Sequence, residues 1–503
     1  MSAQDSYKDL INRVKEVNLI GSCAAVLHWD METQMPKGGA AHRGEQMAYL
    51  SGLTHKKFTD PKIGELLGEI ESSDLVKDEF SDEGANVREI RHEYDKSVKL
   101  PQELVEEIAR TTTLSQQVWV EARKKNDFAM FLPNLEKIID LNRQVADHLG
   151  YEKEAYDALL DNYETGATYE AVSKTFAGLR DELVKLVAGI SNSDKKPNMK
   201  IVEQDFDVHR QRIFGQEAAA AIGYNFHDGR LDISAHPFTT GLGPHDTRIT
   251  TRYNPKHLGQ ALFGTLHEGG HGIYDQNLDP EHYGTPRGDA VSLGIHESQS
   301  RMWENLVGRS KPFWKHFFPR AQQVFPEALG DVKFDDFYFA INDVRPSLIR
   351  VEADEVTYNL HIMIRFEIEH AFLKGDLKAK DIPAAWNERF KEYLGITPPN
   401  DADGCLQDVH WSSGLIGYFP TYALGNLYSA QFFAKAKEEM PDLDDQFARG
   451  DFSGLKNWLG EKIHNHGQRY RAEKLVEVVT GKPLSHEPAV KYLNAKFGEL
   501  YGL

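Results

Sequence analysis

The 503-residue sequence predicts a mainly α-helical protein with one short β segment. Apolar residues recur at the spacing of one helix face in several stretches, among them Leu10, Val14 and Val17, and Leu141, Val145 and Leu149. Thr175–Ile190 and the run from Val356 through Leu360 to Ile364 follow the same spacing. No repeat with a period of 20–50 residues interrupts this pattern. The fold class that follows is mainly α.

The one exception is the stretch before residue 254. Arg230–Phe238 and Asp246–Tyr253 alternate polar residues with apolar or β-branched ones, which is typical of strands. The Gly- and Pro-containing segment Thr240–Pro244 lies between them. We therefore expect a small β-hairpin immediately ahead of the next helix, with an edge that can bind an extended peptide.

Composition narrows the class of protein. No Pro/Gly/Ser-rich linker divides the chain, and the nearest candidate is the short polar loop Ser191–Pro197. We therefore expect residues 1–503 to form a single catalytic unit, with a mainly helical part over 1–199 and a second part over 200–503. Two cysteines, no run of 18 apolar residues and no signal-peptide core predict a cytoplasmic protein that does not enter a membrane. A net charge of −19 argues against a nucleic-acid partner.

The most informative motif is His267-Glu268-Gly269-Gly270-His271, an HExxH sequence. Residues four apart lie on the same helix face, so both imidazoles can reach one cation. Glu268 is about 100° round the helix from His267, which suits a base that takes a proton from water better than it suits a ligand. The alternative is a fortuitous match on an ordinary helix, and chance would supply about 0.07 such strings in this chain.

The surroundings of the motif favour the metal site. Asn254 and Pro255 suit a helix start, and an apolar stripe follows at Leu258, Leu262, Leu266 and Ile273. The two histidines fall roughly 100–160° from the middle of that stripe, toward solvent or a cleft. Gly269 and Gly270 each cost about 1 kcal/mol in a helix interior. We infer that a substrate or another strand approaches closely there.

A second cluster, His296-Glu297-Ser298-Gln299, supplies the third ligand. Asp289 or Ser292 can cap its helix, whose buried stripe is predicted at Ile295, Met302 and Leu306. Glu297 and Arg301 lie four residues apart on the opposite face and can pair. His296 is the rival ligand, but it points about 100° away from Glu297. We favour Glu297 because it lies farther from the apolar stripe.

Three more constellations can line the same cleft. The hairpin contributes His236-Pro237-Phe238 and Asp246-Thr247-Arg248-Ile249-Thr250, and later come Ile349–Asp354 and Gly404–Trp411. Singly, each has an ordinary structural explanation, such as a solvated pair between Arg350 and Asp354. Spacing alone gives these residues no role.

Taken together and in order, these motifs resemble the signature set of the carboxypeptidase Taq family of metallocarboxypeptidases. The opening segment Leu27–Pro36 also resembles that family, so the likeness spans nearly the whole chain. The resemblance implies a two-lobed helical metallopeptidase with a deep central groove, one wall of which residues 1–199 would form. It also implies a cytoplasmic homodimer that releases single C-terminal residues from peptides with broad specificity.

Carried over by residue, the resemblance implies His267, His271 and Glu297 as ligands of one divalent metal ion. Zinc is expected, and cobalt accepts the same ligands. Glu268 becomes the general base and acid, while His410 and Tyr418 bind the developing oxyanion. Arg350 becomes the site for the substrate's terminal carboxylate, with Arg248 as its competitor, and His236 is a further candidate for binding the substrate. The alternative function is an endo-oligopeptidase of the same fold, which would lack a committed carboxylate-binding arginine.

Overall fold

The computed structural model describes residues 2–503 and forms two compact units, each assembled from separate stretches of chain. Unit 1 comprises residues 2–98, 197–341 and 432–483, and unit 2 comprises residues 99–196, 342–431 and 484–503. The mainly helical fold with a small sheet is confirmed. The predicted division at residues 199 and 200, with its groove walls, stays a prediction.

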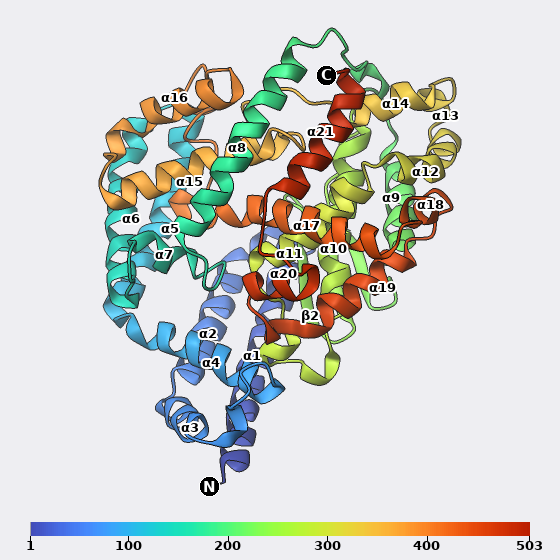
Figure 1. Cartoon of the computed structure of the whole chain (residues 1–503). Helices are drawn as coiled ribbons and strands as arrows, with labels where there is room; N and C mark the ends of the chain where they lie inside the picture. The colour runs from blue at the N-terminus through green and yellow to red at the C-terminus, as the bar shows by residue number, and fades with distance from the viewer. Residues whose placement is uncertain (1) are drawn as a thin grey trace. The chain divides into compact units, whose positions relative to one another are not determined.

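Helices make up most of both units (Figure 1). In unit 1 they are α1 (Ala3–Thr33), α2 (Ala40–Phe58), α3 (Pro61–Glu71), α4 (Asp82–Lys99), α9 (Val208–Ile222), α10 (Leu258–Gln276), α11 (Leu293–Arg301), α12 (Lys311–Val324), α13 (Pro326–Leu329), α14 (Phe334–Ile341), α18 (Leu443–Ala448), α19 (Ser453–Lys462) and α20 (Ala472–Thr480). In unit 2 they are α5 (Gln102–Lys125), α6 (Phe128–Leu149), α7 (Ala155–Leu160), α8 (Tyr169–Asn192), α15 (Tyr358–Lys374), α16 (Ile382–Leu394) and α21 (Glu487–Tyr501), while α17 (Pro420–Glu439) begins in unit 2 and ends in unit 1.

The N-terminal helices show how the apolar stripes read from the sequence become core. Helix α1 begins at the N-cap Ser2, whose hydroxyl accepts the backbone N–H of Asp5. Leu10 and Val14, predicted to share a face, are buried in a cluster with residues of α3 and α4. Burial of each such side chain contributes about 1.5–3 kcal/mol. The stripe therefore fixes which face of α1 packs inward.

The β segment is a three-stranded sheet rather than the predicted two-stranded hairpin. Its strands are β1 (Gly229–Ile233), β2 (Thr239–Gly243) and β3 (Asp246–Thr251), in the order β1-β3-β2. Strand β1 runs parallel to β3, and β2 is the strand that forms the hairpin with β3. The predicted loop Thr240–Pro244 is thus mostly strand, because the tight turn is confined to Pro244 and His245, where His245 adopts a φ of 64°.

Helix α10 packs directly against this sheet and against α9 and α11. Its predicted apolar stripe is confirmed, since Leu258, Leu262, Leu266 and Ile273 are all buried. The predicted helix start at Asn254 is wrong: the N-cap is His257, whose ring nitrogen accepts the N–H groups of residues 259 and 260. Asn254 instead closes the turn before the helix by accepting the N–H of Lys256.

Unit 2 is built from pairs of long helices. Helix α5 packs on α6, and α15 contacts α16, α7 and α8. Helices α8 and α21 lie side by side although they come from distant parts of the sequence (Figure 1). The residues that line α8, from Val172 to Ile190, are buried at helical spacing, which confirms the helix predicted there.

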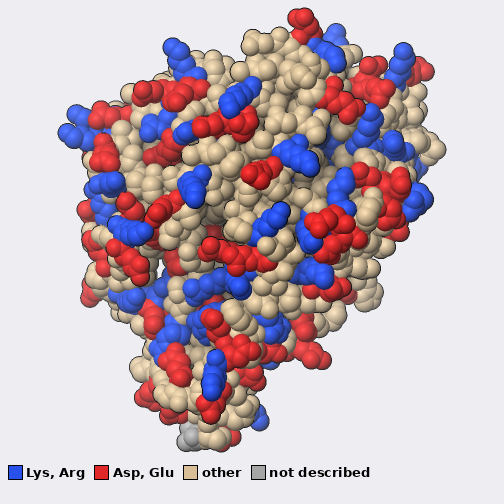
Figure 2. Space-filling model, in the orientation of Figure 1, with Lys and Arg blue, Asp and Glu red and all other residues tan. Residues whose placement is uncertain are grey.

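The surface carries both signs of charge. On the face drawn in Figure 2, lysine and arginine side chains are interspersed with aspartate and glutamate. Among the described residues, no helix is long and apolar enough to span a membrane.

Candidate metal centre and catalytic residues

Three predicted ligands converge in unit 1. His267 and His271 extend from one face of α10, and Glu297 extends toward them from α11. Their ligand atoms all lie within 4.8 Å of one another. One carboxylate oxygen of Glu297 lies 3.6 Å from Nε2 of His267 and 3.4 Å from Nε2 of His271. The helical i,i+4 spacing and one neighbouring helix therefore build the cluster.

The cluster fits a divalent metal ion. Two imidazole nitrogens and a carboxylate oxygen form the donor set of catalytic zinc sites that keep an open position. Ligand bonds of about 2.0–2.1 Å in tetrahedral geometry hold donor atoms about 3.3 Å apart, close to the separations seen here. The carboxylate is anionic: burial opposes its charge, but Arg301 and the two histidines keep the pKa of Glu297 well below its usual range.

A second layer of hydrogen bonds orients two of these ligands, His267 and Glu297. Nδ1 of His267 lies 2.9 Å from a carboxylate oxygen of Glu304, which leaves Nε2 facing Glu297. Arg301 donates from Nε to Glu297 and from Nη1 to Glu304, so one guanidinium holds both carboxylates. The predicted pair between Glu297 and Arg301 is present at 2.7 Å. Outer carboxylates of this kind fix the ring orientation of a metal-binding histidine.

Local helix geometry explains why Glu304 reaches this position. After α11 the chain continues as a π-helical turn, η6 (Met302–Val307), which often marks functional sites. Met302 and Leu306 are buried as predicted, although they belong to this wider turn and not to α11. Its polar side presents Glu304 to His267.

Glu268 is positioned by the sheet. The hydroxyl of Thr239, the first residue of β2, donates to a carboxylate oxygen of Glu268 at 2.7 Å. Glu268 is 6% exposed, and this burial raises the pKa of its carboxyl above the usual value, against the lowering effects of His267 and Thr239. A carboxylate with a raised pKa next to a metal site is suited to accept and return a proton.

A close approach is present at the glycine pair, but a neighbouring helix makes it and not the predicted substrate or strand. A Cβ on Gly270 would lie 2.7 Å from the backbone of residues 299 and 300 in α11. A Cβ on Gly269 would meet only a side-chain atom of Ile222, at 3.5 Å. Only the second glycine is therefore required for α11 to approach α10 closely.

His296, the rival ligand, lies outside the cluster. Its Nε2 is 2.8 Å from Asp275, and its ring stacks on that of His271 with centroids 4.4 Å apart. Asp275 raises the pKa of His296 although burial opposes its charge. The group of possible ligands in the described part of the chain includes Glu297 and not His296.

Arg350, His410 and Tyr418 belong to unit 2. Arg350 starts the short 3-10 turn η7 (Arg350–Glu352). Its Nε donates to Asp408 at 2.9 Å and its Nη1 donates to the hydroxyl of Tyr358 at 3.0 Å. The alternative pair with Asp354 is wrong, because Asp354 accepts hydrogen bonds from Thr357 and the backbone nearby.

Asp408 is the centre of a buried ion network. One of its oxygens accepts from Arg350 and the other from Arg365. Burial opposes its charge, but the two guanidinium groups lower the pKa of Asp408 strongly. Arg350 is also enclosed by the rings of Phe419 and Tyr422. Its guanidinium is therefore rigid, and its Nη2 makes no hydrogen bond within the described chain.

His410 and Tyr418 lie close together. Their ring centroids are 5.4 Å apart, and Nε2 of His410 is 3.3 Å from the hydroxyl of Tyr422. Burial lowers the pKa of His410 to about 4, so its imidazole is neutral near pH 7. A neutral imidazole and a phenol are both hydrogen-bond donors.

Arg248 and His236, the two candidates from the hairpin region, differ in whether another side chain already occupies them. Arg248 has a bidentate ion pair with Asp246, at 2.8 Å for both bonds, and lies over the ring of Trp29. Its fork is therefore already used by a carboxylate. His236 is exposed in the loop between β1 and β2.

Two residues of the metal centre were not assigned from the sequence. Glu304 lies seven residues beyond Glu297, and this spacing places both residues on one helix face. The spacing could therefore have pointed to Glu304 from the sequence. Thr239 follows the motif His236-Pro237-Phe238 directly, but its contact with Glu268 depends on strand β2, where the sequence predicts the loop Thr240–Pro244. Only the tertiary fold brings Thr239 to Glu268, so the sequence alone does not reveal this contact.

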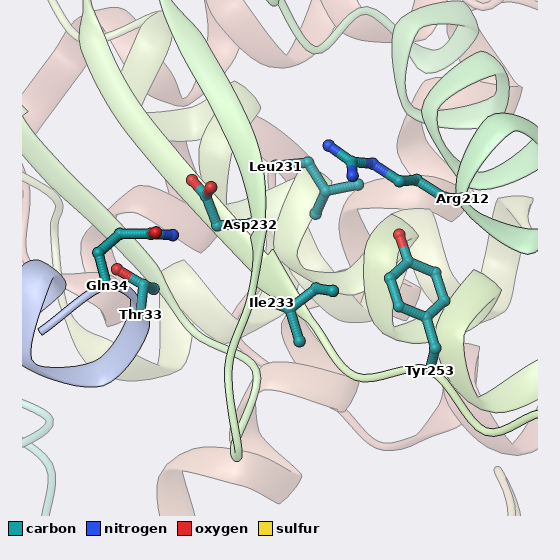
Figure 3. A pocket seen from close by; sticks show the side chains of 7 residues that line it. All are labelled: Thr33, Gln34, Arg212, Leu231, Asp232, Ile233 and Tyr253. Carbon is teal, nitrogen blue, oxygen red and sulfur yellow. The ribbon is translucent and has the colours of Figure 1, made fainter. Parts of the chain in front are cut away.

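A pocket of about 190 Å³ lies elsewhere in unit 1. Its lining comes from the end of α1, from α9, from β1 and from the residues after β3: Thr33, Gln34, Arg212, Leu231, Asp232, Ile233 and Tyr253. Figure 3 shows Arg212 and Tyr253 on one side, Asp232, Gln34 and Thr33 on the other, and the two apolar residues between. None of the predicted ligands or catalytic residues lines it, so it is not the catalytic centre.

Known proteins are similar to this chain in sequence and in fold. The model of the carboxypeptidase Taq (M32) metallopeptidase family matches residues 9–497. The chain is 47% identical over 511 residues to thermostable carboxypeptidase 1 of Thermus thermophilus, across the whole of both chains. It is 39% identical over 498 residues to carboxypeptidase 1 of Bacillus subtilis, across 98% of each chain.

The solved structures agree. The crystal structure of an M32 carboxypeptidase from Deinococcus radiodurans superposes with a TM-score of 0.95 at 41% identity and covers 99% of this chain and 100% of that one. The chain therefore matches these proteins over nearly its whole length, in sequence and in fold. The protein belongs to the carboxypeptidase Taq (M32) family and is a metal-dependent carboxypeptidase.

Proposed function

We propose that His267, His271 and Glu297 hold one catalytic divalent metal ion and that Glu268 is the general base. The observation that carries this proposal is the convergence of three ligand atoms within 4.8 Å, with the carboxylate of Glu268 on the same helix as both histidines. A metal ion bound there supplies Lewis acidity, which polarises a carbonyl group and acidifies water. Zinc suits two imidazoles and a carboxylate, and cobalt accepts the same ligands.

The residues around the metal centre divide the proton transfers between them. Glu268 takes a proton from the attacking water and returns it to the amine that leaves. Thr239 holds the carboxylate by donating to one oxygen, and the other oxygen remains available to the water. His410 and Tyr418 donate hydrogen bonds to the oxygen that becomes negative, an effect often worth about 3 kcal/mol for each donor.

Arg350 is the proposed binding site for the terminal carboxylate of the substrate. Asp408 and Tyr358 hold Nε and Nη1, while Nη2 has no hydrogen bond within the described chain. Arg248, the competitor, already shares its fork with Asp246. An arginine that captures the carboxylate limits cleavage to the last peptide bond, because the groups around the metal alone would serve an endopeptidase equally well.

The setting of the enzyme is also part of the proposal. The substrates are peptides with a free C-terminus and varied terminal side chains, and the protein acts in the cytoplasm. A homodimer is supported by Leu19 and Val26, seven residues apart on one face of α1, which are 60% and 40% exposed. Light scattering on the purified protein checks the mass of the assembly.

The test compares each peptide with its C-terminal amide. Arg350→Ala should cost about 2–5 kcal/mol in kcat/KM on free-acid peptides, because a buried charged hydrogen bond to the substrate is lost. The already slow hydrolysis of the amides should hardly change, since amides never use that contact. Arg350→Lys should restore only part of the rate, because an ammonium does not reproduce the fork. Mass spectrometry of a peptide ladder gives both rates.

Arg248→Ala is the matched control, and it should affect both substrates equally. A loss selective for free acids in Arg248→Ala, and not in Arg350→Ala, would move the carboxylate site to the hairpin. No selectivity in either variant would leave the carboxylate without a binding arginine. Hydrolysis that survives complete chelation would overturn the proposed metal centre.

A further inference from the structure

Glu369, which the reaction described above does not use, is a buried carboxylate in α15 of unit 2. Its side chain is 0% exposed. One oxygen accepts the indole N–H of Trp411 at 2.8 Å. The other oxygen accepts the hydroxyl of Tyr156 at 2.7 Å and the backbone N–H of Gly417 at 3.0 Å. Burying a carboxyl group is costly unless its oxygens are hydrogen-bonded, and here three donors satisfy both oxygens.

Two of these donors flank the segment 411–417. Trp411 follows His410 directly and begins the turn η9 (Trp411–Ser413). Gly417 precedes Tyr418 directly, with a φ of +88°, and a Cβ there would lie 3.0 Å from the backbone of Leu159. Glu369 therefore binds the chain beside both proposed oxyanion donors, His410 and Tyr418.

We propose that Glu369 is a positioning residue that sets the place of the Tyr418 hydroxyl by holding Trp411 and Gly417 together. This inference rests on the proposed role of Tyr418. Gly417 directly precedes Tyr418, and its backbone N–H donates a hydrogen bond to Glu369. This bond restrains the backbone from which the Tyr418 side chain extends. A misplacement of about 1 Å at a catalytic group can lower a rate by about 100-fold.

Glutamine is the informative replacement. It keeps the shape of the side chain but has a single acceptor oxygen, and its amide nitrogen is a donor. In one orientation the amide oxygen faces Gly417 and Tyr156, and the amide nitrogen then faces the N–H of Trp411, which loses its acceptor. In the reverse orientation the amide nitrogen faces Gly417, and the backbone N–H of Gly417 loses its acceptor. One flank of the segment is released in either case.

The experiment is a double-mutant cycle between Glu369→Gln and Tyr418→Phe, with kcat, KM and metal content measured on a free-acid peptide. Glu369→Gln alone should lower kcat about 10- to 100-fold, with KM and metal content unchanged, because only the transition state uses the oxyanion donors. In the Tyr418→Phe background the same substitution should have little further effect. Effects that multiply independently would overturn the inference.

The controls separate positioning from general damage to the core. Glu164 is also buried and accepts a hydrogen bond from Tyr428, so Glu164→Gln should alter stability but leave kcat within about 2-fold. If Tyr418→Phe alone leaves kcat unchanged, the proposed role of Tyr418 as an oxyanion donor is wrong. That outcome does not contradict the anchoring of residues 411–417 by Glu369. Should Glu369→Gln fail to fold, Tyr156→Phe removes one donor and keeps the apolar contacts. The loss of kcat caused by Tyr156→Phe must also disappear when Tyr418→Phe is already present. If the loss persists in the double variant, the inference is wrong.

Discussion

At the scale of single residues, three groups in the candidate metal centre are each held by a neighbouring side chain. His267 is held by Glu304, Glu297 by Arg301, and Glu268 by Thr239. The sequence suggests His267 and His271 as ligands through their i,i+4 spacing on one helix, and Glu297 through its distance from the apolar stripe of its own helix. The sequence does not suggest Thr239, since its contact arises only when β2 reaches α10.

The first prediction separates the base from the ligands. Glu268→Gln should keep the metal and lose nearly all turnover, because an amide cannot take a proton from water. His267→Ala, His271→Ala and Glu297→Ala should lose metal and activity together. Elemental analysis and kcat on the same preparations measure both. His296→Ala is the comparison: loss of stoichiometric metal there, with retention in Glu297→Ala, would reverse the choice of third ligand.

The second prediction concerns Glu304. Glu304→Gln should weaken metal binding about 10- to 100-fold, because an outer carboxylate that orients a ligand histidine contributes that much to affinity. Competition with a chelator of known affinity measures the change. Glu217→Gln, which breaks an exposed pair with Arg320, is the control and should leave affinity unchanged. Equal affinities in all three proteins would mean that Glu304 does not support His267.

At the scale of elements, the centre exists because α10 and α11 approach closely. The sequence indicated this approach through two adjacent glycines but did not identify the partner. Apolar stripes fixed the inward faces of both helices correctly, since such stripes reflect burial directly. The strand pairing was predicted wrongly, because the parallel pairing of β1 with β3 joins segments that no local turn connects.

The glycine pair gives the third prediction. Gly270→Ala should lower the free energy of unfolding by about 1–3 kcal/mol and weaken metal binding, because its Cβ would press on the backbone of α11. Gly269→Ala should instead raise stability by up to about 1 kcal/mol, since alanine favours the helix and the space is open. Urea unfolding of both variants tests the pair. Similar effects at the two positions would contradict the packing argument.

At the scale of the whole molecule, each unit is woven from three stretches of chain. Periodicity predicts helices but not which distant helices pack together, so α8 and α21 could not be paired from the sequence. The buried network around Asp408 was likewise unreadable, because Arg350 and Arg365 meet there only through the fold. The function was assigned from the order of the motifs along the chain, because no single motif outside HExxH indicates a function by its spacing.

The last prediction is a dependence of stability on pH that originates at Glu369. Burial raises the pKa of this carboxyl from 4.5 to about 7, against its three donors. Below pH 4.5 the folded and unfolded chains both hold the proton, and its full contribution to stability is present. As pH rises toward 7 the unfolded chain releases the proton first, so stability is lost, by about 3 kcal/mol in all at about 1.4 kcal/mol per pH unit.

Glu369→Gln removes this titration while other groups keep theirs. The variant should therefore be less stable than the wild type at pH 5, and the difference in the free energy of unfolding should shrink by about 3 kcal/mol by pH 8. Urea unfolding at intervals of one pH unit gives the difference directly. Glu388→Gln, on the exposed side of α16, is the control and should show a constant difference. A constant difference for Glu369→Gln as well would mean that its carboxyl is already ionised throughout this range, because only a proton held more tightly by the folded chain makes stability fall as pH rises.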